Sequence, residues 1–174
     1  GGGDNDSLFG DADDDTLFGD GGDDRLDGGT GNDVMKGGLG NDVYVVDNGF
    51  DVVDDVVLGG VDRVESSISY DLRTVNHIEN LTLTGIAQIN GTGDNSDNVI
   101  TGNGAGNTLL GLDGDDTLNG GGGSGTLDGG RGSDVMRGEA GNDRFIINSN
   151  SGTDATIDGG ADTDTVESSI SFSL

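Results

Sequence analysis

The chain has 174 residues and a formal net charge of −27, because 34 residues are acidic and only seven are basic. This charge argues against a nucleic-acid partner, since binding to phosphates requires a basic surface. No run of 18 apolar residues occurs, so we expect no membrane-spanning helix. Cysteine is absent, aromatic residues make up 4%, and 37 glycines disfavour helices. We therefore expect an all-β protein without disulfides, for which bound metal is the natural source of additional stability.

Residues 1–45 form five consecutive frames of nine residues, which begin at Gly1, Gly10, Gly19, Gly28 and Gly37. The last two frames, GGTGNDVMK and GGLGNDVYV, fit the pattern G-G-x-G-x-D-x-U-x, in which U is a large apolar residue. A period of nine with this pattern is typical of a calcium-binding parallel β-helix. The sixth position is always aspartate and the eighth is always large and apolar: Asp6, Asp15, Asp24, Asp33 and Asp42, with Leu8, Leu17, Leu26, Met35 and Tyr44.

The spacing suits oxygen ligation of a cation. We expect the eighth residue to point inward from a short strand, and the glycines at positions one, two and four to permit left-handed or crowded turns. Such turns aim carbonyl oxygens inward, and the sixth-position aspartate adds a carboxylate. Ca²⁺ takes about six to eight oxygen ligands. The alternative is a flexible acidic linker that binds nothing, but an apolar residue at every ninth position argues against it.

These frames resemble the RTX, or haemolysin-type, calcium-binding repeats of proteins secreted by Gram-negative bacteria. The resemblance implies a parallel β-roll, or β-helix solenoid, in which two frames make one coil and successive turns lie on alternate sides. An ion would lie between turns 18 residues apart. That arrangement stacks Asp6, Asp24 and Asp42 on one side and Asp15 and Asp33 on the other, which gives three sites between coils.

Residues 46–92 interrupt this period, and we expect an irregular β-insert there. Asp51–Leu58 predicts a strand in which Asp54 and Asp55 turn outward or break it. Arg63–Tyr70 and Glu79–Thr84 alternate apolar and polar residues, as half-buried strands do. We prefer a continuation of the same stack, since no linker composition sets the insert apart, and the alternative is a separate small β-domain.

A second ladder of six frames spans residues 93–146, with an apolar eighth position throughout. Its sixth position varies: Asn98, Asn107, Asp116, Gly125, Asp134 and Asp143. Asp116 and Asp134 form the only full carboxylate pair expected there, and Asn98 offers an amide oxygen to a weaker site. Gly125 lacks a side chain in the middle of its column, so we expect poor Ca²⁺ binding on that side.

Residues 147–174 are expected to begin a second, truncated insert, because the sequence VESSIS at 64–69 returns at 166–171. Asp164 holds a sixth-like position and would provide one further ligand. The expected ligands are the sixth-position side chains and the carbonyl groups of first- and fourth-position glycines: Asp6, Asp15, Asp24, Asp33, Asp42, Asn98, Asp116, Asp134, Asp143 and Asp164, with Gly28, Gly31, Gly37, Gly40, Gly129 and Gly132.

The sequence and the resemblance together predict a module that folds on binding roughly three to six Ca²⁺ ions outside the cell. The chain would be a fragment of a larger protein exported by type I secretion, in contact with neighbouring domains. No catalytic Ser/His/Asp set, zinc motif or cofactor loop is recognisable, so we expect no enzyme activity here, although the parent protein would be free to carry a catalytic domain. The alternative is an adhesion or polysaccharide-binding module that contacts the cell surface.

Overall fold

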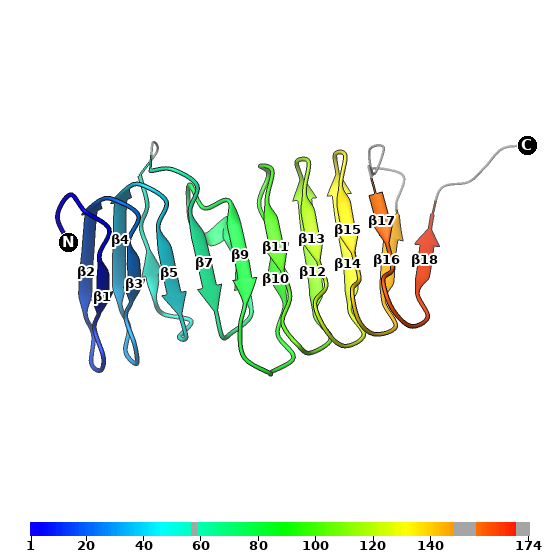
Figure 1. Ribbon diagram of the computed structural model, residues 1–174, viewed down its shortest axis with the longest axis horizontal. Coiled ribbons are helices and arrows are strands. Elements are labelled where there is room, and N and C mark those ends of the chain that lie inside the picture. Colours follow the sequence, from blue (N-terminus) through cyan, green and yellow to red (C-terminus); the bar gives the residue numbers. More distant parts are fainter. Residues whose placement is uncertain (57–58, 148–155, 170–174) are drawn as a thin grey trace, which may run out of the picture. The chain divides into compact units, whose positions relative to one another are not determined.

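The computed structural model describes residues 1–56, 59–147 and 156–169 of the chain (Figure 1). Two compact units are present. The first comprises Gly1–Ile68 and Leu72–Thr82, and the second comprises Ser69–Asp71 and Leu83–Leu174. Each unit is a parallel β-solenoid, which confirms the expected fold class. The described residues contain one short 3-10 helix, Leu72–Thr74, and no helix among them is long and apolar enough to cross a membrane.

In the first unit, strands that follow alternate turns form two sheets. One sheet has the order β1, β3, β5, β7 and β9, and the unit boundary falls within β9. The other has the order β2, β4 and β6. The strands are β1 (Ser7–Phe9), β2 (Thr16–Gly21), β3 (Arg25–Asp27), β4 (Val34–Leu39), β5 (Val43–Val46), β6 (Val52–Val53), β7 (Arg63–Ser66) and β9 (Asn80–Leu83).

The second unit repeats this arrangement. One sheet has the order β11, β13, β15 and β17, and the other has the order β8, β10, β12, β14, β16 and β18. The strands are β8 (Tyr70–Asp71), β10 (Gly91–Thr92), β11 (Val99–Thr101), β12 (Thr108–Asp113), β13 (Thr117–Asn119), β14 (Thr126–Arg131), β15 (Val135–Arg137), β16 (Arg144–Ile147), β17 (Thr156–Asp158) and β18 (Thr165–Ser168).

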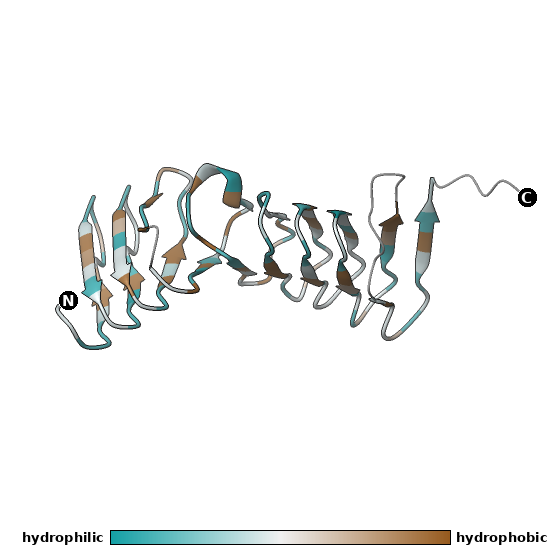
Figure 2. Ribbon diagram, turned by 90° about the horizontal axis from the view of Figure 1, so that it is seen from above, coloured by the Kyte–Doolittle hydropathy of each residue, from teal (hydrophilic) through white to brown (hydrophobic). Residues whose placement is uncertain are grey.

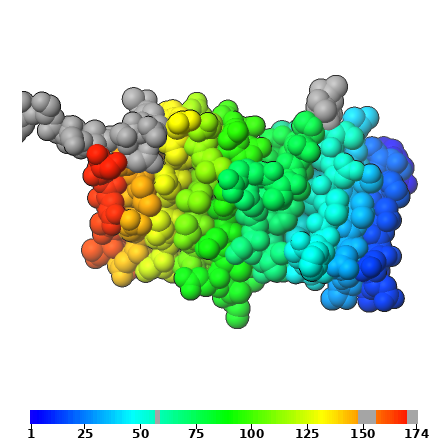
Figure 3. Space-filling view, turned by 180° about the vertical axis from the view of Figure 1, so that it is seen from behind, coloured from blue at the N-terminus to red at the C-terminus, as the bar shows by residue number. Residues whose placement is uncertain are grey.

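The register places residues of the same frame position on top of one another. Leu8 pairs with Leu26, and Leu17 pairs with Met35, in both cases 18 residues apart. Leu109 pairs with Leu127 at the same spacing. Two frames therefore make one coil, as the sequence predicts, and consecutive coils of each unit lie side by side as bands of changing colour in Figure 3.

The core of each unit is a stack of eighth-position side chains. Apolar residues, brown in Figure 2, are concentrated in the strands, and the turns are mostly polar. Leu8 and Leu17, in the first coil, are only half-buried because no coil precedes them. Nine eighth-position residues have no exposed surface: Leu26, Met35, Tyr44, Ile100, Leu109, Leu118, Leu127, Met136 and Phe145.

The turns require a left-handed residue at the second frame position, even where glycine is replaced. Gly38 has a φ of 110°, and Asp20 and Glu139 adopt 74° and 69° at the same position. Leu112 does so at 89°, which is costly for a branched side chain. The coil geometry therefore overrides the conformational preference of the individual residue.

The irregular coils lengthen in their turns while strand pairing continues. Val43 pairs with Arg63, 20 residues later, and Arg144 pairs with Thr165, 21 residues later. Within 51–58 only Val52–Val53 is a strand, and residues 57–58 lie outside the described part. Asp54 is exposed and follows the end of this strand, as expected, but an outward orientation was wrong for Asp55, which is buried.

Candidate metal centres

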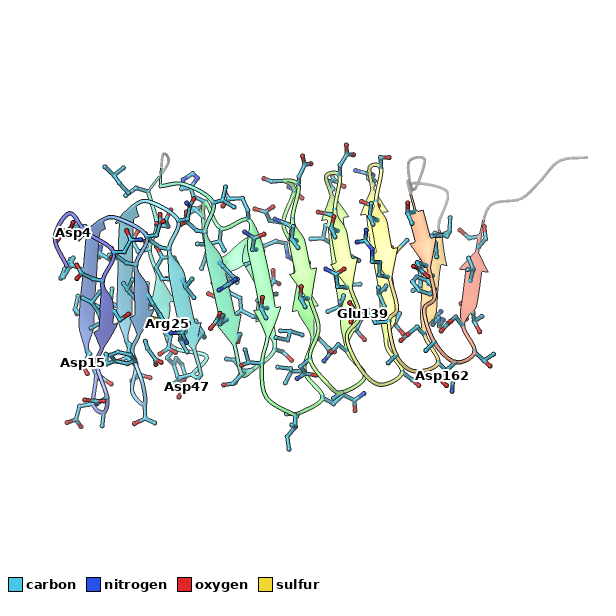
Figure 4. The ribbon with its side chains drawn as sticks, viewed as in Figure 1. Asp4, Asp15, Arg25, Asp47, Glu139 and Asp162 are labelled. Carbon is cyan, nitrogen blue, oxygen red and sulfur yellow. The ribbon has the colours of Figure 1, made fainter. Side chains whose placement is uncertain are left out.

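The sixth-position residues form four columns, two in each unit. In the first unit, one column precedes the strands of one sheet and the second precedes those of the other. The turns that carry Asp4 and Asp15 accordingly lie at opposite sides of the first coil (Figure 4). The columns are Asp6, Asp24, Asp42 and Asp62; Asp15, Asp33 and Asp51; Asn98, Asp116 and Asp134; and Asn107, Gly125, Asp143 and Asp164.

One carboxylate oxygen of each stacked aspartate is fixed by the preceding coil. The backbone N–H of Asp6 donates to Oδ1 of Asp24 at 2.7 Å, and that of Asp24 donates to Oδ1 of Asp42 at 2.8 Å. In the second unit, the N–H of Asp116 donates to Oδ1 of Asp134 at 2.9 Å. The same bond recurs from coil to coil, so each carboxylate is held in a defined orientation.

The second carboxylate oxygen is buried and has no hydrogen-bond partner. Asp33 and Asp134 have no exposed surface, and Asp24 retains 2%. An ionised carboxylate in such surroundings carries a large desolvation cost unless a cation compensates it. The oxygens concerned in the columns are Oδ2 of Asp15, Asp24, Asp33, Asp42, Asp62, Asp116, Asp134 and Asp143.

Glycine at the first frame position leaves a space beside this free oxygen. A Cβ atom on Gly138 would lie 2.5 Å from Oδ2 of Asp143 and 2.6 Å from the carbonyl oxygen of Gly159, in the next coil. On Gly10 it would lie 2.8 Å from Oδ2 of Asp15 and 2.5 Å from the carbonyl oxygen of Gly28. The space is lined by a carboxylate of one coil and a carbonyl of the next, a donor set that suits Ca²⁺.

Comparison with known families bears directly on these columns. The sequence model of the RTX calcium-binding nonapeptide repeat matches the chain in four copies, at residues 1–35, 18–53, 92–127 and 120–154. Together these matches span more than half of the chain. The chain belongs to this family. A comparison with curated protein sequences gave no significant match.

The glycines proposed from the RTX pattern have two structural roles. The carbonyl oxygens of Gly37 and Gly129 lie beside the spaces of the preceding coils, at Gly19 and Gly111. The fourth-position glycines have positive φ values, 127° at Gly40, 138° at Gly132 and 159° at Gly31. A Cβ atom at any of these three would overlap a carbonyl oxygen of the previous coil, so glycine permits the close stacking of turns. Ligation by their own carbonyls stays a prediction.

Three aspartates of the insert were not recognised in the sequence. Oδ1 of Asp51 accepts the N–H of Asp33 at 3.1 Å, and Oδ1 of Asp62 accepts that of Asp42 at 2.7 Å. Asp51 and Asp62 thus extend the two columns beyond the first RTX ladder, whereas Asp55 enters the interior between them. The available signal was the spacing Asp-x-Val, which persists at Asp51–Val53 and Asp62–Val64 although the glycines are lost.

The second ladder is weaker in carboxylates, as its sequence indicates. The amide oxygen of Asn98 accepts the N–H of Asp94 at 2.8 Å. Asn107 is engaged locally, because its Oδ1 accepts the N–H of Asn103 at 2.9 Å. Gly125 contributes only its N–H, which donates to Oδ1 of Asp143 at 2.8 Å. Asp164 continues this column by accepting the N–H of Asp143 at 2.9 Å.

A second polar ladder runs along the fifth frame position, in the opposite direction. Oδ1 of Asp14 accepts the N–H of Asn32 at 2.8 Å, and Oδ1 of Asp23 accepts that of Asn41 at 2.7 Å. The sixth-position side chain reaches the preceding coil, whereas the fifth-position side chain reaches the following one. Sequence reasoning treated this position as variable, although a short polar acceptor occupies it in most frames.

The electrostatics of the columns favour neutralisation. Burial is the main cause that raises the pKa of Asp62 and of Asp116, in each case to about 7. Backbone hydrogen bonds oppose the shift, and the negative charges of Asp55 and Asp134, respectively, add to it. Burial likewise raises the pKa of Asp42 and Asp143. In the absence of a cation, a proton would therefore compete for these carboxylates.

Proposed function

We propose that Ca²⁺ binds between stacked aspartates of consecutive coils, through the free Oδ2 atoms and the first-position carbonyls of the next coil. The buried, unpartnered oxygens carry this proposal, because each is rigidly placed and lacks a compensating positive charge. Seven junctions join two stacked aspartates in the described residues, slightly more than the sequence led us to expect, because Asp51 and Asp62 lengthen the columns.

We infer further that Ca²⁺ binding and folding of the module are one process. With a net charge of −27, the metal-free chain repels itself, and its core is supplied mainly by one apolar residue per frame. The ligands for each ion come from different coils, so the sites exist only in the folded chain. The free energy of metal binding is then free energy of folding.

This coupling suits a module of a larger secreted protein. Where free Ca²⁺ is low, inside the cell, the chain would stay unfolded and able to pass through a type I export channel. Outside the cell, Ca²⁺ would neutralise the columns and drive formation of the coils. Adhesion or polysaccharide binding stays the alternative prediction, and a glycan array probed with and without Ca²⁺ would test it.

A Ca²⁺ titration followed by far-ultraviolet circular dichroism tests the proposal. In EGTA we expect a largely unordered spectrum, and with Ca²⁺ a β-rich one. Mg²⁺ should substitute poorly, because it demands a tighter octahedral shell. KCl of equal ionic strength separates general screening of charge from site binding. A β-rich spectrum in EGTA that does not change on addition of Ca²⁺ would refute the coupling.

A further inference from the structure

Three buried carboxylates converge at the end of the first ladder. The ligand oxygens of Asp42, Asp55 and Asp62 lie within 4.8 Å of one another. Asp42 and Asp62 are each 1% exposed and Asp55 is 8% exposed. In all three residues Oδ2 is buried and has no hydrogen-bond partner. Three negative charges in such a volume require a compensating positive charge.

Each carboxylate is oriented by a single hydrogen bond to its other oxygen. Oδ1 of Asp42 accepts the N–H of Asp24 at 2.8 Å, and Oδ1 of Asp62 accepts that of Asp42 at 2.7 Å. Oδ1 of Asp55 accepts the hydroxyl of Tyr44 at 2.6 Å. That hydroxyl in turn accepts the N–H of Gly37 at 3.0 Å, so the Tyr44 side chain is fixed at its polar end.

Asp55 stands where the regular frames have their first glycine. Val34 and Met35 pair with Val52 and Val53. Lys36 forms an ion pair with Asp54, and the next position therefore matches Gly37 with Asp55. In a regular coil this glycine leaves the space beside the Oδ2 atom open. Here a third carboxylate enters the space instead.

Glycine lines the remaining side of the cluster. A Cβ atom on Gly59 would lie 2.6 Å from Oδ2 of Asp55 and 3.1 Å from Oδ2 of Asp62. It would also lie 3.1 Å from the carbonyl oxygen of Gly38. The absence of a side chain at residue 59 thus keeps a space bounded by two carboxylates and one carbonyl oxygen.

We propose that Asp42, Asp55 and Asp62 form a three-carboxylate Ca²⁺ site that binds the ion more tightly than the two-carboxylate junctions of the ladders. Its distinguishing ligand is Asp55, which no position of the repeat supplies. Ligand charge and rigidity are the factors that tune Ca²⁺ affinity in oxygen sites, and both are increased here. The identity of the ion rests on the proposed function, whereas the three-carboxylate cluster itself does not.

Terbium luminescence excited through tyrosine reads this site selectively. Tb³⁺ prefers the same oxygen ligands as Ca²⁺ and emits when a nearby tyrosine transfers its excitation. Tyr44 and Tyr70 are the only tyrosines, and tryptophan is absent. We expect the signal to reach its plateau near the first molar equivalent of Tb³⁺, and prior addition of Ca²⁺ to suppress it. Tyr44→Phe should abolish the signal, and Tyr70→Phe should retain it.

Asp55→Asn tests the third carboxylate, and Asp54→Asn is its matched control. Both variants remove one negative charge at adjacent positions, but Asp54 is exposed and Asp55 is buried. Asparagine at position 55 still offers an oxygen to the Tyr44 hydroxyl. We expect Asp55→Asn to weaken tyrosine-sensitised Tb³⁺ binding by about tenfold or more, and Asp54→Asn to leave it nearly unchanged. Circular dichroism in saturating Ca²⁺ verifies that both variants fold.

Equal Tb³⁺ affinities for the two variants would overturn the proposal, because Asp55 would then not be a ligand. A wild-type protein that folds with Ca²⁺ but gives no tyrosine-sensitised emission would also overturn it, and would indicate carboxyl groups that share a proton. Neither result affects the proposed function. Conversely, sensitised emission from a chain whose circular dichroism does not respond to Ca²⁺ would refute coupled folding and leave the three-carboxylate site standing.

Discussion

Replacing Gly125 by aspartate should create a Ca²⁺ site in the second unit. Gly125 is not among the glycines with positive φ, so its backbone suits any residue. An added Cβ would lie 3.0 Å from the carbonyl oxygen of Asn107 and 3.3 Å from Oδ1 of Asp143, which requires shifts of only a few tenths of an ångström. The space beside Gly120 already holds the carbonyl oxygen of Gly138 at 2.6 Å and lacks only a carboxylate.

The gain should depend on the ion. An ion that binds only the folded state, at a free concentration about 100 times its Kd, stabilises that state by about 2.7 kcal/mol. For a chain of this length, each kcal/mol raises Tm by about 2–4 °C, so the variant should melt about 5–11 °C higher in Ca²⁺. In EGTA it should melt lower than wild type, because an uncompensated carboxylate has been buried.

Thermal melts in Ca²⁺ and in EGTA, together with calorimetric ion counting, measure both effects. Gly125→Asn is the control, since asparagine occupies the same column at Asn107 without a charge, and it should add neither an ion nor the Ca²⁺-dependent increase in Tm. An aspartate variant with the same ion count and the same Ca²⁺-dependent Tm as wild type would show that the missing carboxylate is not what limits binding here.

Two further predictions concern the columns. Asp24→Ala should lose more Ca²⁺ affinity in calorimetry than Asp143→Ala, because Asp24 joins two aspartate pairs whereas Asp143 faces Gly125 on one side; equal losses would contradict the 18-residue pairing. In EGTA, residual folded structure should decrease as pH rises from about 5 to 8, since the pKa of Asp62 and of Asp116 is raised by burial to about 7. The protonated form is favoured by the fold, so its contribution is complete below the unfolded pKa and is lost as pH passes the folded value. Ca²⁺ affinity should change in the opposite direction, because the ligands must be deprotonated, and circular dichroism and calorimetry across this range check both signs.

The register and core were predictable because one constraint, a period of nine, fixes both. The apolar eighth residue identifies the inward direction, and Leu26 or Leu118 then follows without knowledge of any partner. The stacking of Asp6 with Asp24 needs only the count of 18 residues per coil. These features are local and repeat in sequence, so a pattern contains them.

The three-carboxylate cluster was not predictable in this way. Asp55 lies within a stretch that resembles a strand, and its burial depends on β6 ending at Val53. Tyr44 was recognised as an apolar core residue, but the direction of its hydroxyl follows only from the packed coil. The column extension through Asp62 was hidden by a coil of 20 residues, since a search at a period of nine does not reach it.

The opposed ladders at positions five and six have a consequence for how such chains change length. Coils are joined there by a short side chain and a main-chain N–H, so each junction tolerates any neighbour with the same two residues. Duplication or loss of 18 residues returns every position to its own sheet, whereas a change of nine exchanges the two sheets. Recombination between copies can therefore alter the number of coils, and with it the number of ions held, without requiring a compensating mutation in the interior.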